Sequence, residues 1–355
     1  MSVPPSFVIN PLNPSNNDNA VQRSSFPSFP PQYDQETKRI KRNRIIAAIL
    51  VVTVITIVIM ITAVILSSPS DVAPPDDTHE DDKPVIDPID DDDKPASISP
   101  LSVHFLDVGQ ADATLIKGNN LSILIDAGHW QRSDVVPKLL HLNVTYLDLL
   151  ILTHPHADHI GQVPSVVYNI PTKEAFASGD LATTQTFGRY LRSLLINNVL
   201  YKEPRQGDFF VIKDLEIEVL NPRFIDGNFH RGCLSTRITY GNISFIFTGD
   251  AESITESTIV NRNVNISAQI LKLGHHGSST STTQKFLDAV KPMVGIWSAS
   301  STNQYGHPHL SVLERLDENQ VNVYGTAVNG DIEVVVDGKG GFEVIPSKGE
   351  KRERT

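Results

Sequence analysis

The chain has 355 residues, of which 40% are hydrophobic, so it can hold one large domain or two ordinary ones with a substantial core. The formal net charge is −11, but residues 71–95 alone carry eleven acidic and two basic groups, whereas residues 1–44 carry six basic and three acidic groups. The acidity therefore says little about the partners of the folded part. Cys233 is the only cysteine, which excludes an intrachain disulfide.

The first 100 residues predict three segments outside any folded domain. Residues 1–44, rich in Pro, Asn and Ser, are expected to form a disordered cytoplasmic tail; its prolines leave open a short polyproline ligand. Residues 45–66 are uncharged and dominated by Ile and Val, and as a helix they would span roughly 33 Å, enough for a bilayer core. Residues 67–100 are rich in Asp and Pro and predict an extended acidic linker.

The charge step across residues 45–66 predicts their orientation. Five basic residues precede this stretch and aspartates follow it, so the positive-inside rule places the N-terminus in the cytosol and the rest of the chain outside. A cleaved signal peptide is the alternative, but the apolar run is too long and its leader exceeds forty residues. We therefore expect a single-pass signal anchor in the cell membrane.

Residues 101–346 predict the folded domain, and residues 347–355 form a charged tail. A first series comprises strands over 103–108, 113–117 and 122–127, a helix that Ser133 caps and that continues to about His141, a strand over 149–152, a helix from about Ile160, and an amphipathic helix over 183–197. A second series comprises strands over 209–212, 215–220, 234–240, 243–248, 269–273, 294–298, 322–324, 332–336 and 341–345, with helices over 252–261, 282–290 and 311–318. Two strand series with helices indicate an α/β fold of two face-to-face sheets covered by helices.

Metal-competent side chains follow the strand that ends at Leu152. His154, His156, Asp158 and His159 lie within six residues, and Pro155 prevents the strand from continuing as a helix. Imidazole and carboxylate ligands at this density suit zinc or a similar divalent metal. Two such metals would activate a water and bind a substrate oxyanion. The alternative, a His-rich surface loop, fits poorly with a loop that directly follows a buried strand.

Two later strands end in the same way. The strand over 243–248 leads to Asp250, whose carboxylate can bridge two cations; alternatively Asp250 is the N-cap of the helix that follows. The strand over 269–273 leads to His275 and His276, for which a surface histidine pair is the alternative. Several strands that each end in candidate metal ligands support a metal site more strongly than any one of them does.

The strand over 122–127 carries a further carboxylate. Asp126 is expected to orient His154 or His156 by accepting a hydrogen bond from the ring nitrogen that does not bind metal.

The order of these motifs resembles a known family. The metal loop His-Pro-His-Ala-Asp-His matches the His-x-His-x-Asp-His signature of the metallo-β-lactamase superfamily. The opening Asp-Val-Gly-Gln-Ala-Asp and the later Thr-Gly-Asp, His-His-Gly-Ser and Tyr-Gly-His-Pro motifs are similar to the hydrolase domain of ComEC-type competence proteins, over roughly residues 101–346. The resemblance implies a four-layer αββα sandwich, here preceded by one transmembrane helix, and a domain that degrades a DNA strand.

The resemblance also implies roles for individual residues. The implied metal ligands are His154, His156, Asp158, His159, Asp250 and one of His275 or His276, with His276 preferred because Gly-Ser follows it. His307 becomes a candidate for contacting phosphate or protonating a leaving group.

Two features depart from the family. ComEC-type proteins also carry a many-helix channel, and one membrane span cannot form a DNA pore. The superfamily commonly has a further ligand histidine before the Asp250 strand, and here His230 is the only histidine in that interval. It either fills that role or is a loop histidine, and Cys233 beside it is expected to be a packed residue.

The sequence thus predicts a membrane-anchored, extracytoplasmic hydrolase with a two-metal site for Zn²⁺ or Mn²⁺, acting on DNA or another phosphodiester. Asp158 is expected to bind metal and orient the nucleophile. The alternatives are an ester, lactone or lactam hydrolase on the same scaffold, and a metal-binding surface module without turnover. Basic residues are scattered, so the nucleic-acid assignment depends on the resemblance. The sequence indicates no protein partner.

Overall fold

The computed structural model describes residues 99–349. The expected cytoplasmic tail (1–44), the expected membrane span (45–66), nearly all of the acidic linker and the last six residues lie outside the described residues. Within residues 99–349, no helix has both the length and the apolar character needed to cross a membrane.

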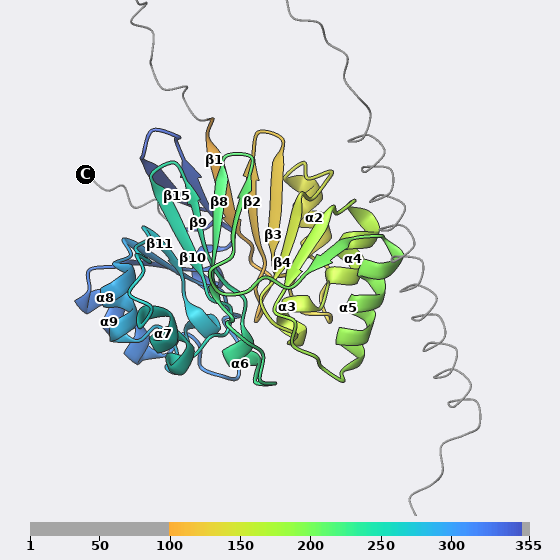
Figure 1. Cartoon of the computed structure of the whole chain (residues 1–355). Coiled ribbons are helices and arrows are strands. Elements are labelled where there is room, and N and C mark those ends of the chain that lie inside the picture. The colour runs from red at the N-terminus through yellow and green to blue at the C-terminus, as the bar shows by residue number, and fades with distance from the viewer. Residues whose placement is uncertain (1–98, 350–355) are drawn as a thin grey trace, which may run out of the picture. The chain divides into compact units, whose positions relative to one another are not determined.

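The strands form two sheets (Figure 1). The eight-stranded sheet has the order β15 (Phe342–Pro346), β14 (Ile332–Val336), β1 (Leu101–Phe105), β2 (Thr114–Gly118), β3 (Leu121–Ile125), β4 (Leu149–Leu152), β5 (Glu174–Ala177), β6 (Leu200–Lys202). The seven-stranded sheet has the order β13 (Asn322–Gly325), β12 (Val294–Trp297), β11 (Ile270–Lys272), β10 (Ile243–Phe247), β9 (Ser235–Tyr240), β8 (Leu215–Asn221), β7 (Phe209–Ile212).

The sheets pack face to face through alternating apolar side chains. In β1 every second residue is buried, as the period of a half-buried strand requires. Phe105 of one sheet and Phe247 of the other stack with ring centroids 6.1 Å apart, at the centre of a buried cluster that draws on both sheets. This central core joins the two halves into one sandwich.

Helices cover both outer faces. A second buried cluster joins the eight-stranded sheet to α2 (Val135–His141), α4 (Val163–Asn169) and α5 (Gln185–Ile196). A third joins the seven-stranded sheet to α7 (Ser253–Val260), α8 (Gln284–Val290) and α9 (Leu310–Glu318). The expected arrangement of helices, two sheets and helices is therefore present (Figure 1).

Most expected elements are present, and the differences have local causes. Ser133 does not cap α2; the residue before the helix is Asp134, and its side chain makes no capping bond. Leu195 shares the helical spacing of the apolar residues in the expected helix 183–197, yet it is 78% exposed, because the buried stripe of α5 runs through Phe187, Tyr190 and Leu194. Cys233 is buried, as expected of a packed residue.

Both sheets contain parallel strands whose carboxyl ends lead to the candidate ligands. β3, β4, β5 and β6 are parallel neighbours in the first sheet, and β10, β11, β12 and β13 are parallel neighbours in the second. In open α/β sheets, ligands bind beyond the carboxyl ends of such strands. The loops that follow β4, β10 and β11 meet there.

Candidate metal centre and cleft

The metal loop places four side chains within one short turn. His154 and His159 are almost fully buried. His156 has an extended backbone and directly precedes α3 (Ala157–Ile160). Asp158 and His159 both lie in α3. His154 Nε2 and His156 Nδ1 are 2.8 Å apart. The sharp change from strand to helix therefore gathers all four candidate ligands at the end of β4.

Asp250 lies between the histidines. Its Oδ2 is 3.5 Å from His154 Nε2, and its Oδ1 is 3.3 Å from His159 Nε2 and 3.7 Å from His276 Nε2. Gly249 makes this approach possible, because a Cβ there would lie 2.7 Å from Thr153 Cβ. The alternative of an N-cap is wrong, since Glu252 is the residue that precedes α7.

The two histidines after β11 face different parts of the site. Both residues have positive φ, 49° for His275 and 57° for His276, a conformation that costs a non-glycine residue energy and is concentrated at functional sites. His276 Nε2 lies 3.3 Å from Asp158 Oδ2, inside the cluster. His275 Nε2 lies 3.7 Å from Asp250 Oδ2 and its Nδ1 is 3.5 Å from Glu252 Oε1, toward the rim.

His230 also joins the cluster. It belongs to α6 (Phe229–Gly232), and its ring centroid is 5.4 Å from that of His156 and 4.8 Å from that of His275. His156, His230 and Asp250 each offer a ligand atom within 4.8 Å of the others. Its Nδ1 is 3.3 Å from Glu252 Oε1, a contact that nothing in the sequence predicted.

The donor set fits divalent cations. Within the described residues, His159 Nε2, His276 Nε2 and Asp250 Oδ1 are buried yet make no hydrogen bond. Burial favours the neutral form of Asp250, but His159 and His276 outweigh it and hold the pKa of Asp250 well below its usual value. Imidazole nitrogens and an ionised carboxylate that converge without hydrogen-bond partners are what a zinc-type cation requires.

Asp126 supports the cluster, though not as predicted. It accepts hydrogen bonds from Thr153 N at 2.9 Å and Thr153 Oγ1 at 2.8 Å, and its Oδ2 is 2.8 Å from His159 Nδ1. The expectation that it contacts His154 or His156 was wrong, because β3 and β4 are parallel neighbours and His159 returns over the end of β3. Thr153 Oγ1 is 3.1 Å from His154 Nδ1, so Asp126 reaches that ring only through Thr153.

Sequence reasoning missed a buried ion pair beneath His276. Lys272 Nζ lies 2.9 Å from Asp112 Oδ2, and Asp112 Oδ1 lies 3.3 Å from His276 Nδ1. Burial acts to raise the pKa of Asp112, but Lys272 and His276 together hold it below its usual value. The signal was present: Lys272 lies between the apolar residues Leu271 and Leu273, and a lysine in a buried apolar stretch must be paired.

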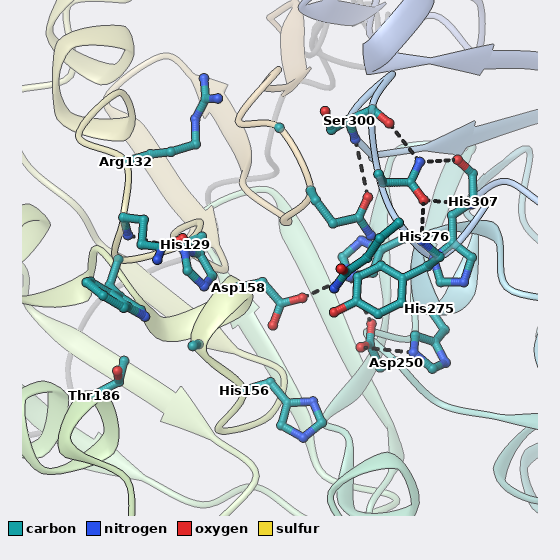
Figure 2. A pocket seen from close by; sticks show the side chains of 18 of the residues that line it. His129, Arg132, His156, Asp158, Thr186, Asp250, His275, His276, Ser300 and His307 are labelled. Carbon is teal, nitrogen blue, oxygen red and sulfur yellow. Dashed lines mark hydrogen bonds and ion pairs between the residues drawn. The ribbon is translucent and has the colours of Figure 1, made fainter.

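A cavity of about 960 Å³ opens above the cluster. Its floor includes His156, Asp158, Asp250 and His276. Figure 2 shows Asp158 and His156 between His129 on one side and the group with Asp250, His276 and His307 on the other. His307 lies on one wall, with its ring centroid 5.7 Å from that of His275. Burial and the neighbouring His276 and His275 lower the pKa of His307 to about 4. Within the described residues its Nδ1 is buried without a hydrogen bond.

Comparison with known proteins gives a consistent result. Residues 106–296 match the family model described as the metallo-beta-lactamase superfamily. The chain is 30% identical to ComE operon protein 3 of Bacillus subtilis over 71% of its own length and 35% of that protein. It is 31% identical to Recombination protein 2 of Haemophilus influenzae (65% and 28%) and 30% identical to Competence protein ComA of Neisseria gonorrhoeae (68% and 33%). It thus spans about a third of the length of these relatives.

Proposed function

The chain belongs to the metallo-beta-lactamase superfamily and is related to competence proteins, and from this we propose that it is a metal-dependent phosphodiesterase that cleaves DNA. The observation that supports a hydrolytic site is the convergence of His159 Nε2, His276 Nε2 and Asp250 Oδ1, buried without hydrogen bonds among the described residues, on the floor of a 960 Å³ cavity.

Divalent cations held here would supply Lewis acidity for hydrolysis. We assign His154, His156 and Asp250 to one set of ligands, which His230 would complete. The other set would comprise Asp158, His159, Asp250 and His276. Asp250 Oδ2 faces His154 and Asp250 Oδ1 faces His159, so the carboxylate would be available to both sets.

The chain's own residues position the substrate and the attacking water. Asp158 is partly exposed to the cavity through a side chain that also faces His276, so it can orient a water at the floor. The low pKa of His307 keeps its ring neutral at physiological pH, so it would donate a hydrogen bond to a phosphate oxygen rather than supply a positive charge.

A panel assay tests this proposal. The full chain in detergent, loaded with Zn²⁺ or Mn²⁺, is offered single- and double-stranded DNA, RNA, a small phosphodiester, an ester, a lactone and a lactam. We expect hydrolysis of phosphodiesters and one to two equivalents of metal by elemental analysis. Turnover of the lactam or ester alone would assign the site to that class. A protein that binds metal without any turnover would be a metal-binding module.

We also propose that residues 45–66 anchor the chain in a membrane, with the hydrolase outside the cytoplasm. The support is the charge step in the sequence, since basic residues precede this apolar stretch and acidic residues follow it. Protease added to intact cells should release a soluble fragment cut within residues 67–100. Full protection of that fragment, while a surface control is digested, would contradict the orientation.

A further inference from the structure

Two aromatic side chains line the cavity with their faces accessible. Trp130 is 51% exposed and Tyr305 is 56% exposed, and both belong to the cavity whose floor carries the candidate ligands. The Trp130 ring lies 5.6 Å from the His129 ring and the Tyr305 ring lies 5.6 Å from the His307 ring, centroid to centroid. Figure 2 shows His129 and His307 on opposite sides of Asp158. An accessible aromatic face at a cavity is what a nucleic-acid base needs in order to stack.

The wall that carries Trp130 is firmly held. Gly161 N donates to Gly128 O at 2.9 Å, and a Cβ at Gly161 would lie only 2.1 Å from Trp130 N, so the loop is seated directly on the end of α3. His129 O accepts from Arg132 N, and His129 Nδ1 accepts from Gln131 N at 3.2 Å. The indole is therefore presented by backbone that is already ordered.

The Asn303 side chain holds the loop that carries Tyr305 through four hydrogen bonds to its backbone. Asn303 Nδ2 donates to Ser300 O and His307 O, both at 2.7 Å, and Asn303 Oδ1 accepts from the backbone N–H groups of Tyr305 and His307. The Tyr305 ring stacks on the His307 ring, with centroids 5.6 Å apart and planes at 26°. One face of Tyr305 is thus supported and the other is available.

The cavity offers little positive charge to attract a polyanion. Among its lining residues within the described part of the chain, Arg132 is the one Arg or Lys, and its guanidinium forms an ion pair with Asp134 at 2.5 Å. The walls instead carry neutral polar side chains, namely Gln110, Gln131, Thr184, Thr186, Ser300, Thr302, Asn303 and Gln304. Away from the proposed metal centre, affinity for a nucleic acid would therefore come from ring faces and neutral hydrogen bonds rather than from charged side chains.

We propose that Trp130 and Tyr305 are base-stacking platforms on either side of the scissile phosphate, and that they select an unpaired nucleic-acid strand over a duplex. The inference rests on the proposed phosphodiesterase function. Every base has a ring face, so stacking tolerates any sequence, whereas the bases of a duplex keep their faces within the helix. Because few charges contribute, binding should depend weakly on salt, with a logarithmic slope near −0.7 if about one phosphate is neutralised.

The test compares substrates that differ only in their bases. The metal-loaded full chain is assayed on a single-stranded oligonucleotide, its duplex and an abasic strand with the same phosphates. We expect the base-bearing single strand to be preferred. Trp130→Ala and Tyr305→Ala should each raise KM about 5- to 150-fold with kcat nearly unchanged, as loss of one stacked base implies. Trp130→Phe should retain most of the affinity.

Tyr168→Ala is the matched control, since Tyr168 is 57% exposed but lies on α4 outside the cavity. A direct readout of stacking is quenching of indole fluorescence by a phosphorothioate strand. The chain has two tryptophans, and Trp297 is 8% exposed, so the quench should vanish in Trp130→Phe. Equal cleavage of the single strand, duplex and abasic strand would overturn the inference while leaving the phosphodiesterase intact. Cleavage of none of them would remove both proposals.

Discussion

Two buried carboxylates each contact one candidate ligand histidine through its Nδ1. Asp126 Oδ2 lies 2.8 Å from His159 Nδ1, whereas His276 Nδ1 lies 3.0 Å from the Ser298 carbonyl oxygen and 3.3 Å from Asp112 Oδ1. Both rings therefore direct Nε2 toward Asp250. Such contacts fix the tautomer and the ring plane, which raises the affinity of a histidine for metal. His159 follows a strand of the eight-stranded sheet and His276 a strand of the seven-stranded sheet, and in both an oxygen at Nδ1 leaves Nε2 for a metal.

Lys272→Met should reveal what the buried pair contributes. Without Lys272, Asp112 keeps a buried charge beside His276 with no cation, which costs about 3–5 kcal/mol of unfolding free energy. The variant should unfold at lower denaturant and retain less metal. Lys272→Met combined with Asp112→Asn should recover part of the loss, because no unpaired charge remains. Lys285→Met, at an exposed lysine, is the control. Additive losses in the double variant would contradict the coupling.

His307→Asn separates catalysis from structure. If His307 donates to the scissile phosphate or the leaving oxygen, its loss should lower kcat on the order of 10²–10⁴-fold. Metal content and melting temperature should stay near the parent values, because its Nδ1 makes no hydrogen bond with any described residue. His154→Ala is the contrast and should lose metal, activity and stability together. Full activity in His307→Asn would remove this residue from the site.

The sequence predicted the side chains of the cluster better than their partners. Spacing and strand ends identified His154, His156, His159, Asp250 and His276, which the structure brings together. The partners Glu252, Asp112 and Lys272 escaped because each depends on which strands lie side by side, and strand order is not encoded in local spacing. Asp126 was recognised as a supporting carboxylate but matched to the wrong histidine for the same reason.

At the scale of elements, periodicity succeeded where elements are long and apolar. β1 and α5 follow their expected periods closely. β5 and β6 were not predicted: β5 has four residues, two of them alanine, and β6 is a three-residue exposed edge strand, so neither carries an alternating pattern. β5 forms by parallel pairing with β4, and β6 by parallel pairing with β5, and such pairing between distant segments is tertiary information.

Glu256 connects two helices on the outer face of the seven-stranded sheet. It belongs to α7 and is 1% exposed, and its carboxylate accepts from Thr282 N at 2.5 Å and Thr283 N at 2.9 Å, where α8 begins. Glu256→Ala would leave these N–H groups without an acceptor, at a cost of about 1–3 kcal/mol in unfolding free energy. Chemical denaturation measures the loss, with Glu314→Ala at an exposed position of α9 as control. Equal midpoints for both variants would show that the contact is neutral.

The part of the chain that the structure describes has one end that carries the candidate ligands and an opposite end that does not. The candidate ligands follow the carboxyl ends of β4, β10 and β11, and they meet, so the amino ends of these strands lie at the other end of the sandwich. Four Asn-x-Ser/Thr triplets begin at exposed asparagines that precede the amino ends of β3, β4, β10 and β11, namely Asn120, Asn143, Asn242 and Asn265. A glycan at any of them would project away from the cavity.

This placement gives a test of both the orientation and the cleft. When the full chain is expressed in a eukaryotic secretory host, an extracytoplasmic domain should acquire N-linked glycans at these asparagines. Each Asn→Gln variant should carry one glycan fewer and therefore migrate one step faster in a gel. Hydrolysis should be unaffected.

Thr184→Asn creates a fifth triplet on the cavity wall, and asparagine is as good an N-cap for α5 as threonine. That variant should be modified and should cleave long strands poorly until a glycosidase restores access. A chain that acquires no glycan at any triplet would place the domain on the cytosolic side, whereas a glycosylated Thr184→Asn protein with undiminished activity would show that substrates do not cross that wall.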